Sequence, residues 1–212
     1  NRQPSSATTA VNGVVVYRSV PTFSYDTTTA HVAAGASVPV LSFNVSADSK
    51  GDVKLYQLKF LVSTSTATFT SASFSGPTGS ANITTSAPDP SGYVTVTFGT
   101  TNDATISAGT TKSYTLRGTV AYTGSTNTVG SVSVALVADT AVLANPTTGN
   151  GLASTSGATA APNSANSGWA PLATASGGGA TTDRDWTNAY GLGGCFPGVG
   201  LGSNCLAKTT SN

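Results

Sequence analysis

Few side chains in this sequence could carry out chemistry. His31 is the only histidine, so any Ser–His or Cys–His nucleophilic arrangement would have to use it. No carboxylate lies closer to it along the chain than Asp26. A solvated histidine at the edge of a strand is therefore a better interpretation of His31 than a general base.

Carboxylates are equally sparse. Asp48 and Asp52 could supply oxygen ligands to calcium, but Lys50 lies between them and a turn explains the pattern better. A glycosidase needs a pair of carboxylates, and no local motif selects one. We therefore predict no catalytic residue, no cofactor, no metal site and no enzymatic activity. The sequence has no glutamate, and its aspartates are Asp26, Asp48, Asp52, Asp89, Asp103, Asp139, Asp183 and Asp185.

The two cysteines, Cys195 and Cys205, lie close together in a Gly-rich stretch. In an exported chain, such a pair predicts one disulfide that closes a short loop. There is no third cysteine and no nearby histidine, so we do not expect zinc. The chain lacks methionine and opens at Asn1, which suggests that a secretory segment has been removed; an expression boundary is the alternative. Both features favour an extracellular or cell-surface location.

Charge is scarce and evenly spread. Charged residues make up 8% of the chain, against about 25% in ordinary soluble domains. The longest apolar runs, such as Val14–Tyr17, are far shorter than the ~20 residues that a membrane-spanning helix needs. We therefore expect no membrane span. Nine basic and eight acidic side chains form no basic stripe, so nucleic acid is not an expected partner.

The elements that must position these residues are strands. Residues 38–47 alternate, with Leu41 and Phe43 on one face and Ser42 on the other. No segment shows a helical apolar stripe. The even spacing predicts an antiparallel sandwich of about seven strands. They are expected at residues 14–20, 38–47, 53–63, 69–74, 93–98, 113–122 and 131–137, with a turn at 48–52, a bulge near Tyr56–Gln57 and a short edge at 106–109.

The two ends differ from this middle region in composition. We divide the chain into an N-terminal arm (1–12), a sandwich domain (13–145) and a Gly/Ser/Thr/Ala-rich extension (146–212). The ends have too few apolar groups to offset their own ordering entropy, so any order there must come from the sandwich or from neighbouring copies. The arm could be a strand lent to a neighbour, or an ordinary first strand. The candidates for assembly contacts are Val14, Val15, Val16, Trp169, Trp186 and Tyr190.

Two stretches, 38–60 (VPVLSFNVSADSKGDVKLYQLKF) and 106–120 (ISAGTTKSYTLRGTV), resemble the paired strands of bacterial extracellular Ig-like surface proteins. The resemblance covers about residues 13–145 and implies a sandwich of the Ig-like or jelly-roll type in a cell-surface or filament-forming protein. It transfers no catalytic residue. The C-terminal cysteine loop is similar to that of type IV pilins, but the long apolar N-terminal helix of those proteins is absent from this sequence.

Two glycan-related readings remain open. Asn44-Val-Ser46 and Asn82-Ile-Thr84 fit the glycosylation sequon, and Asn44 is expected to be the better site because alternation turns it outward. Trp169, Trp186 and Tyr190 could stack on sugar rings, although packing anchors explain them better. The expected function is a structural subunit of an extracellular filament, pilus or surface layer, polymerising with copies of itself through its terminal extensions. The alternative is a carbohydrate-binding or adhesive surface module with a glycan as partner.

Overall fold

The computed structural model describes residues 19–25, 32–99, 102–123, 130–137, 168–171 and 207–211. Within them the chain is all-β, with eleven strands and one three-residue 3-10 helix, η1 (Asn102–Ala104). Every strand pairing is antiparallel. The strands are β1 (Thr22–Tyr25), β2 (Gly35–Ser46), β3 (Val53–Ser65), β4 (Ala67–Ser75), β5 (Ile83–Thr85), β6 (Tyr93–Phe98), β7 (Thr105–Ile106), β8 (Thr111–Tyr122), β9 (Ser131–Leu136), β10 (Gly168–Pro171) and β11 (Ala207–Ser211).

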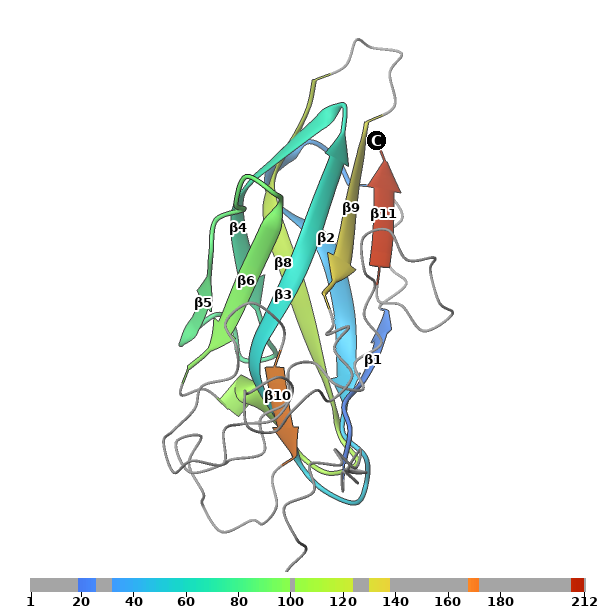
Figure 1. Ribbon diagram of the computed structural model, residues 1–212, viewed down its shortest axis with the longest axis vertical. Helices are drawn as coiled ribbons and strands as arrows, with labels where there is room; N and C mark the ends of the chain where they lie inside the picture. Colours follow the sequence, from blue (N-terminus) through green and yellow to red (C-terminus); the bar gives the residue numbers. More distant parts are fainter. Residues whose placement is uncertain are drawn as a thin grey trace, which may run out of the picture.

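These strands form two sheets that lie one behind the other (Figure 1). We call them sheet A, with the order β1-β2-β8-β4, and sheet B, with the order β11-β9-β3-β6-β5. The short strands β7 and β10 also pair with β3. The predicted all-β, antiparallel class is confirmed, and the arrangement is consistent with a β-sandwich.

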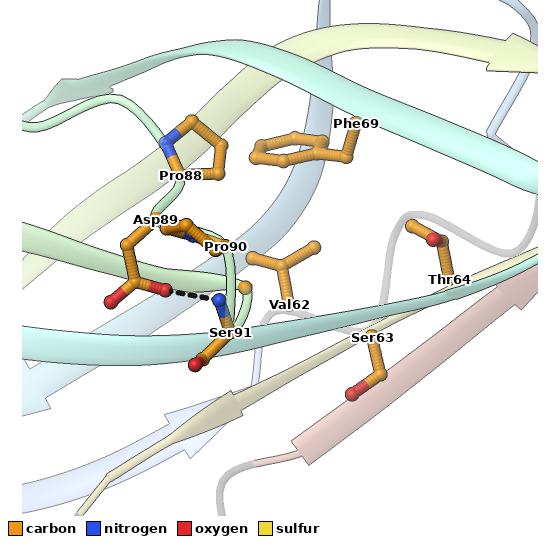
Figure 2. Close-up of a pocket in the computed structure, with 9 residues that line it drawn as sticks. Val62, Ser63, Thr64, Phe69, Pro88, Asp89, Pro90 and Ser91 are labelled. Atoms are coloured by element: carbon orange, nitrogen blue, oxygen red, sulfur yellow. Dashed lines mark hydrogen bonds between the residues drawn. The ribbon is translucent and has the colours of Figure 1, made fainter.

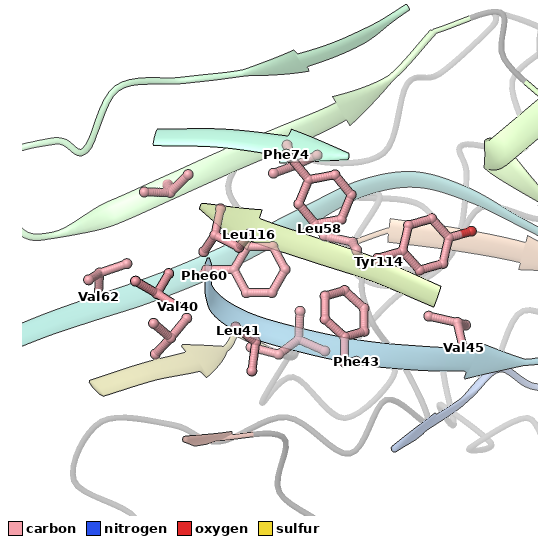
Figure 3. Packing of buried hydrophobic residues seen from close by; sticks show 14 of the residues in the cluster. Val40, Leu41, Phe43, Val45, Leu58, Phe60, Val62, Phe74, Tyr114 and Leu116 are labelled. Carbon is pink, nitrogen blue, oxygen red and sulfur yellow. The ribbon is translucent and has the colours of Figure 1, made fainter. Parts of the chain in front are cut away.

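The core fills the space between the two sheets. Period-two alternation sends Leu41, Phe43 and Val45 of β2 inward, where all three are completely buried. Strand β3 contributes Leu58 and Phe60 in the same way (Figure 3). This alternation had been predicted from the sequence, because a half-buried strand must place its apolar residues on one face.

Bulges in several strands adjust which side chains face inward, and in β2 a register shift between Pro39 and Leu41 lets the neighbours Val40 and Leu41 both be buried. In the pairing of β3 with β10, Gly168 is opposite Gln57 and Trp169 is opposite Leu55, so Tyr56 has no opposite residue on β10. This register shift confirms the predicted bulge near Tyr56–Gln57. In β4, Phe69 and Phe74 are both buried although an odd number of positions separates them. A register shift between Thr70 and Ser73 makes this compatible with a single strand.

Most of the predicted strands are present with small differences in length. Strand β6 has the predicted bounds, and the edge and turn at 106–109 are β7 and the turn that follows it. The first strand is expected at 14–20, of which residues 14–18 lie outside the described ranges; Ser19 and Val20 are not part of a strand, and β1 begins at Thr22. The sequence did not predict β5, β10 or β11. Among the described residues no helix is long and apolar enough to cross a bilayer.

Candidate assembly edges

The sequence predicts self-assembly, which would use the outer strands of the sheets. Among the described strands, the outer ones are β1 and β4 in sheet A and β5 and β11 in sheet B. Figure 1 places β4 and β5 along one side of the molecule and β1 and β11 along the other. An outer strand of a sheet carries backbone N–H and C=O groups that can pair with another chain.

Strand β4 is the longest of these outer strands, with nine residues. It pairs with β8 on one side, and no described strand pairs with the other. Its sequence, ATFTSASFS, contains neither a charge nor a proline, which are the usual devices against edge pairing. The device present is the bulge, where Ser71 has a positive φ of 52°. This bulge divides the edge into Ala67–Thr70 and Ser73–Ser75.

On the opposite side of the molecule, β9 is covered by β11. Five consecutive residue pairs join the two strands, from Ala207 opposite Ala135 to Ser211 opposite Ser131. Strand β9 has no charged residue, and its inward side chains Val132, Val134 and Leu136 are buried. Without β11, an uncharged core strand would therefore be the edge of sheet B.

The backbone direction of β9 follows from one hydrogen bond. The Val137 N–H donates to the Lys59 carbonyl of β3 over 2.8 Å. Because backbone groups alternate in direction along a strand, Ser133 has its backbone groups toward β3, and Val132 and Val134 have theirs toward β11. Ser133 and Thr209, which are opposite each other, therefore form a non-hydrogen-bonded pair of the β9–β11 ladder.

The extension also contributes β10 to sheet B. Trp169 lies opposite Leu55, and Pro171 lies opposite Val53, on β3. Two short stretches of residues 146–212 thus pair with strands of the 13–145 region. The rest of the extension and the N-terminal arm lie outside the described residues. So do His31, Val14, Val15, Val16, Trp186, Tyr190, Cys195 and Cys205, and the roles predicted for these residues stay predictions.

The two aspartates considered for calcium hold turns. Asp48 Oδ1 accepts a hydrogen bond from the Lys50 N–H at 2.8 Å, and Asp52 Oδ1 accepts one from the Ala108 N–H at 2.8 Å. The first bond closes the predicted turn at 48–52. Within the described ranges no three His, Cys, Asp or Glu side chains come together as metal ligands would.

Asp103 in η1 is a buried carboxylate with a structural role. Its Oδ2 accepts hydrogen bonds from the Thr78 N–H at 3.0 Å and the Thr78 hydroxyl at 2.8 Å, which ties the turn after β4 to η1. A Cβ on Gly76 would lie 2.5 Å from Oδ2, so this close approach requires glycine. The Tyr114 hydroxyl donates to the Asp103 carbonyl at 2.6 Å. Burial, and secondarily the charge of Asp103, raises the pKa of Tyr114.

A cleft of about 360 Å³ opens beside the loop between β5 and β6. Phe69, Val62, Pro88 and Pro90 supply apolar surface, and Asp89 and several hydroxyls supply polar groups (Figure 2). The loop is held rigidly, because Asp89 Oδ1 accepts hydrogen bonds from the N–H groups of Ser91 at 2.8 Å and Tyr93 at 2.9 Å.

The second fixed point of this loop is Gly92. Its carbonyl accepts the Val62 N–H at 2.9 Å, and its φ of 84° suits glycine. A Cβ at this position would lie 2.3 Å from the Val62 carbonyl oxygen. The cleft wall is therefore preformed rather than dependent on a ligand for its shape.

The outer face of sheet A carries many small polar side chains, together with Arg117, which donates to the Ser37 carbonyl. Ser113 donates to Asn44 Oδ1 at 2.6 Å, and hydroxyl pairs join Ser46 to Thr111 at 2.7 Å. The sequon residue Asn44 thus faces outward, as expected, but it is half-buried and engaged with Ser113. The second sequon residue, Asn82, is exposed in a turn with φ 57°, so it is the more accessible of the two, which corrects the expectation that Asn44 is the better site.

The β4 edge and the β9–β11 pairing were not identified from the sequence. For β4 a signal existed, because residues 67–75 contain no charge and no proline. For β11 the five residues Ala207–Ser211 are too short and too polar to show period-two alternation.

No protein-family model matches this chain, and a search of curated proteins finds no similar sequence.

Proposed function

We propose that this chain is a structural subunit of an extracellular filament, pilus or surface layer, that its sandwich is Ig-like, and that it polymerises by pairing strand edges with copies of itself. The proposal includes the absence of enzymatic activity. The observation that carries it is the β4 edge, which has neither charge nor proline and which one bulge divides into Ala67–Thr70 and Ser73–Ser75. Monomeric proteins normally protect such an edge, whereas a subunit that must pair with its neighbours uses it.

The composition supports the same function. With 8% charged residues, the chain has few groups that would keep strand edges of separate copies apart. The described carboxylates accept hydrogen bonds in turns or in the η1 contact; they are Asp48, Asp52, Asp89 and Asp103. Backbone pairing needs no particular side chain, so a surface rich in serine and threonine is compatible with assembly.

The first test measures the size of the particles that the wild-type chain forms in solution. We expect sedimentation and electron microscopy to show regular polymers as the concentration rises. A wild-type chain that stays monomeric at every concentration at which it is soluble would overturn the proposed function.

A matched pair of variants tests whether the β4 edge takes part. Thr68 on β4 and Ala121 on β8 are directly opposite each other, and both are exposed. A lysine at the edge obstructs pairing with another strand, whereas a lysine on the central strand β8 does not lie at an edge. We expect Thr68→Lys to lower the polymerised fraction and Ala121→Lys to leave it unchanged. Equal behaviour of the two variants would show that the β4 edge is not the contact.

The cleft supports a second candidate function, binding of a carbohydrate as an adhesive module. Its volume of about 360 Å³ lies within the ~300–1,000 Å³ typical of small-molecule sites. Thr64 lines the cleft, whereas its exposed neighbour Ser65 does not. We expect any glycan bound by the wild type to be lost in Thr64→Arg and retained in Ser65→Arg. A glycan array without hits would remove this candidate.

A further inference from the structure

The β9–β11 ladder has the geometry of a contact that can be exchanged between chains. Strand β11 pairs with β9 and with no other described strand. Its partner, β9, is fixed in the sandwich through β3, from Phe60 opposite Leu136 to Ser65 opposite Ser131. The acceptor edge is therefore built into the domain, and the strand that covers it comes from a distant part of the sequence.

Covalent connection does not restrict β11 to its own sandwich. Thirty-five residues (172–206) separate the end of β10 at Pro171 from the start of β11 at Ala207. A chain of that length can span at most about 120 Å, and about 90 Å if the predicted disulfide between Cys195 and Cys205 shortens it, which is still about three times the diameter of a small domain. A β11 strand can therefore reach the β9 edge of an adjacent copy as well as its own.

Exchange would preserve every backbone pair of the ladder. The five residue pairs between Ala207–Ser211 and Ser131–Ala135 are the same whether the two strands belong to one chain or to two. The gain for an assembly is connectivity, because each copy both gives a strand and accepts one. Such a head-to-tail contact closes into a ring or continues as an open fibre.

We propose that β11 completes the β9 edge of a second copy of this chain, so that exchange of this strand links successive subunits. The inference rests on the proposed structural function and names its contact. It adds a second contact on the side of the molecule opposite the β4 edge (Figure 1).

Disulfide trapping tests this directly. Ser133 and Thr209 are opposite each other on β9 and β11. Non-hydrogen-bonded pairs have Cα atoms about 4.5 Å apart, within the range that a disulfide can bridge. We would make Ser133→Cys and Thr209→Cys separately, on chains of different mass in which Cys195 and Cys205 are replaced by serine. The replaced background must first be shown to polymerise like the wild type.

The two single variants are then mixed, assembled and oxidised. Exchange predicts a covalent dimer that contains one chain of each mass, because β11 of one copy lies against β9 of the other. A chain carrying both substitutions should, in the assembly, give a ladder of covalent multimers. The matched control is Ser63→Cys with Ser133→Cys, a pair on β3 and β9 within one sandwich. It should crosslink within chains only.

Each other outcome overturns the proposal. If Ser133→Cys with Thr209→Cys crosslinks only within single chains, β11 stays on its own sandwich. If that pair never crosslinks while the control pair does, β11 covers no β9 edge at all. In both cases regular polymers of the wild type would leave the proposed structural function standing, with another contact responsible, whereas a monomeric wild type would remove both.

Discussion

The interior around Phe43 and the β9–β11 edge are both part of the fold, but different forces hold them. The rings of Phe43 and Tyr114 stack with centroids 5.7 Å apart, and both side chains are almost completely buried. The edge is a backbone ladder of five residue pairs. Side-chain packing depends on shape and specifies one arrangement, whereas a backbone ladder accepts any strand of suitable length. The interior therefore determines the fold, and the edge is where the proposed exchange would take place.

The largest expected effect comes from the centre of the interior. Phe43 packs against Phe23 at 6.0 Å, Phe60 at 5.9 Å, Phe74 at 6.1 Å and Tyr114 at 5.7 Å between ring centroids. Removing the ring leaves a cavity, so Phe43→Ala should lower the free energy of unfolding by about 3–5 kcal/mol. Urea unfolding followed by circular dichroism measures this loss.

The control for that prediction keeps most of the apolar volume. Phe43→Leu should cost clearly less than Phe43→Ala, because a smaller cavity remains. If the two variants lost the same free energy, the aromatic cluster would not be the main source of specificity in the interior. The contrast with the edge would then fail.

A smaller effect is expected at the polar end of the interior. Asp103 is 1% exposed and holds Thr78 through two hydrogen bonds. Asp103→Ala removes both acceptor contacts and should cost about 1–3 kcal/mol of unfolding free energy. Thr78→Val removes only the hydroxyl contact and should cost less. A larger loss for Thr78→Val in the same urea titration would show that the carboxylate does not hold this turn.

Because Tyr114 is buried in the interior, we expect the free energy of unfolding to depend on pH in the alkaline range. Burial raises the pKa of Tyr114 above its usual value of about 10, so the folded chain keeps this proton when the unfolded chain has lost it. Stability from this group is complete below pH ~10 and falls above it, by up to about 1.4 kcal/mol per pH unit. Tyr114→Phe should show a shallower loss between pH 10 and 11.

Tyr122 provides a comparison for this pH effect, because burial raises its pKa as well. Its hydroxyl donates to the Val32 carbonyl at 2.5 Å, but the side chain is only half-buried. We expect Tyr122→Phe to change the alkaline slope less than Tyr114→Phe does. Unfolding free energies measured at each pH would contradict the assignment if the wild type and Tyr114→Phe had identical slopes.

The same contrast explains how much could be predicted from the sequence. Strands with one apolar face, such as β6 with Val94 and Val96, were predicted because burial imposes period-two alternation. The bulge at Tyr56 was predicted for the same reason, since the alternation changes parity there. Residues 207–211 show no such pattern, because a strand of five mostly polar residues is too short to display alternation.

The candidate sites were harder to predict than the fold. The Asp103 contact joins residues 25 positions apart, and only the fold shows that the turn at Gly76 and η1 meet. The cleft likewise depends on Val62 of sheet B facing Phe69 of sheet A. Sequence spacing gives the order of strands along the chain, but it does not give the order of strands within a sheet.

The smallest expected effect lies on the outer face of sheet A, on the same strands that form the interior. Ser113→Ala removes the exposed hydrogen bond to Asn44, and an exposed cross-strand pair contributes about 0.2–1 kcal/mol. A double-mutant cycle with Asn44→Ala isolates this pair energy. A coupling above about 1 kcal/mol would mean that the outer hydroxyls help to determine the fold. A value within the expected range leaves the outer face, like the edge, free to serve contacts with other molecules.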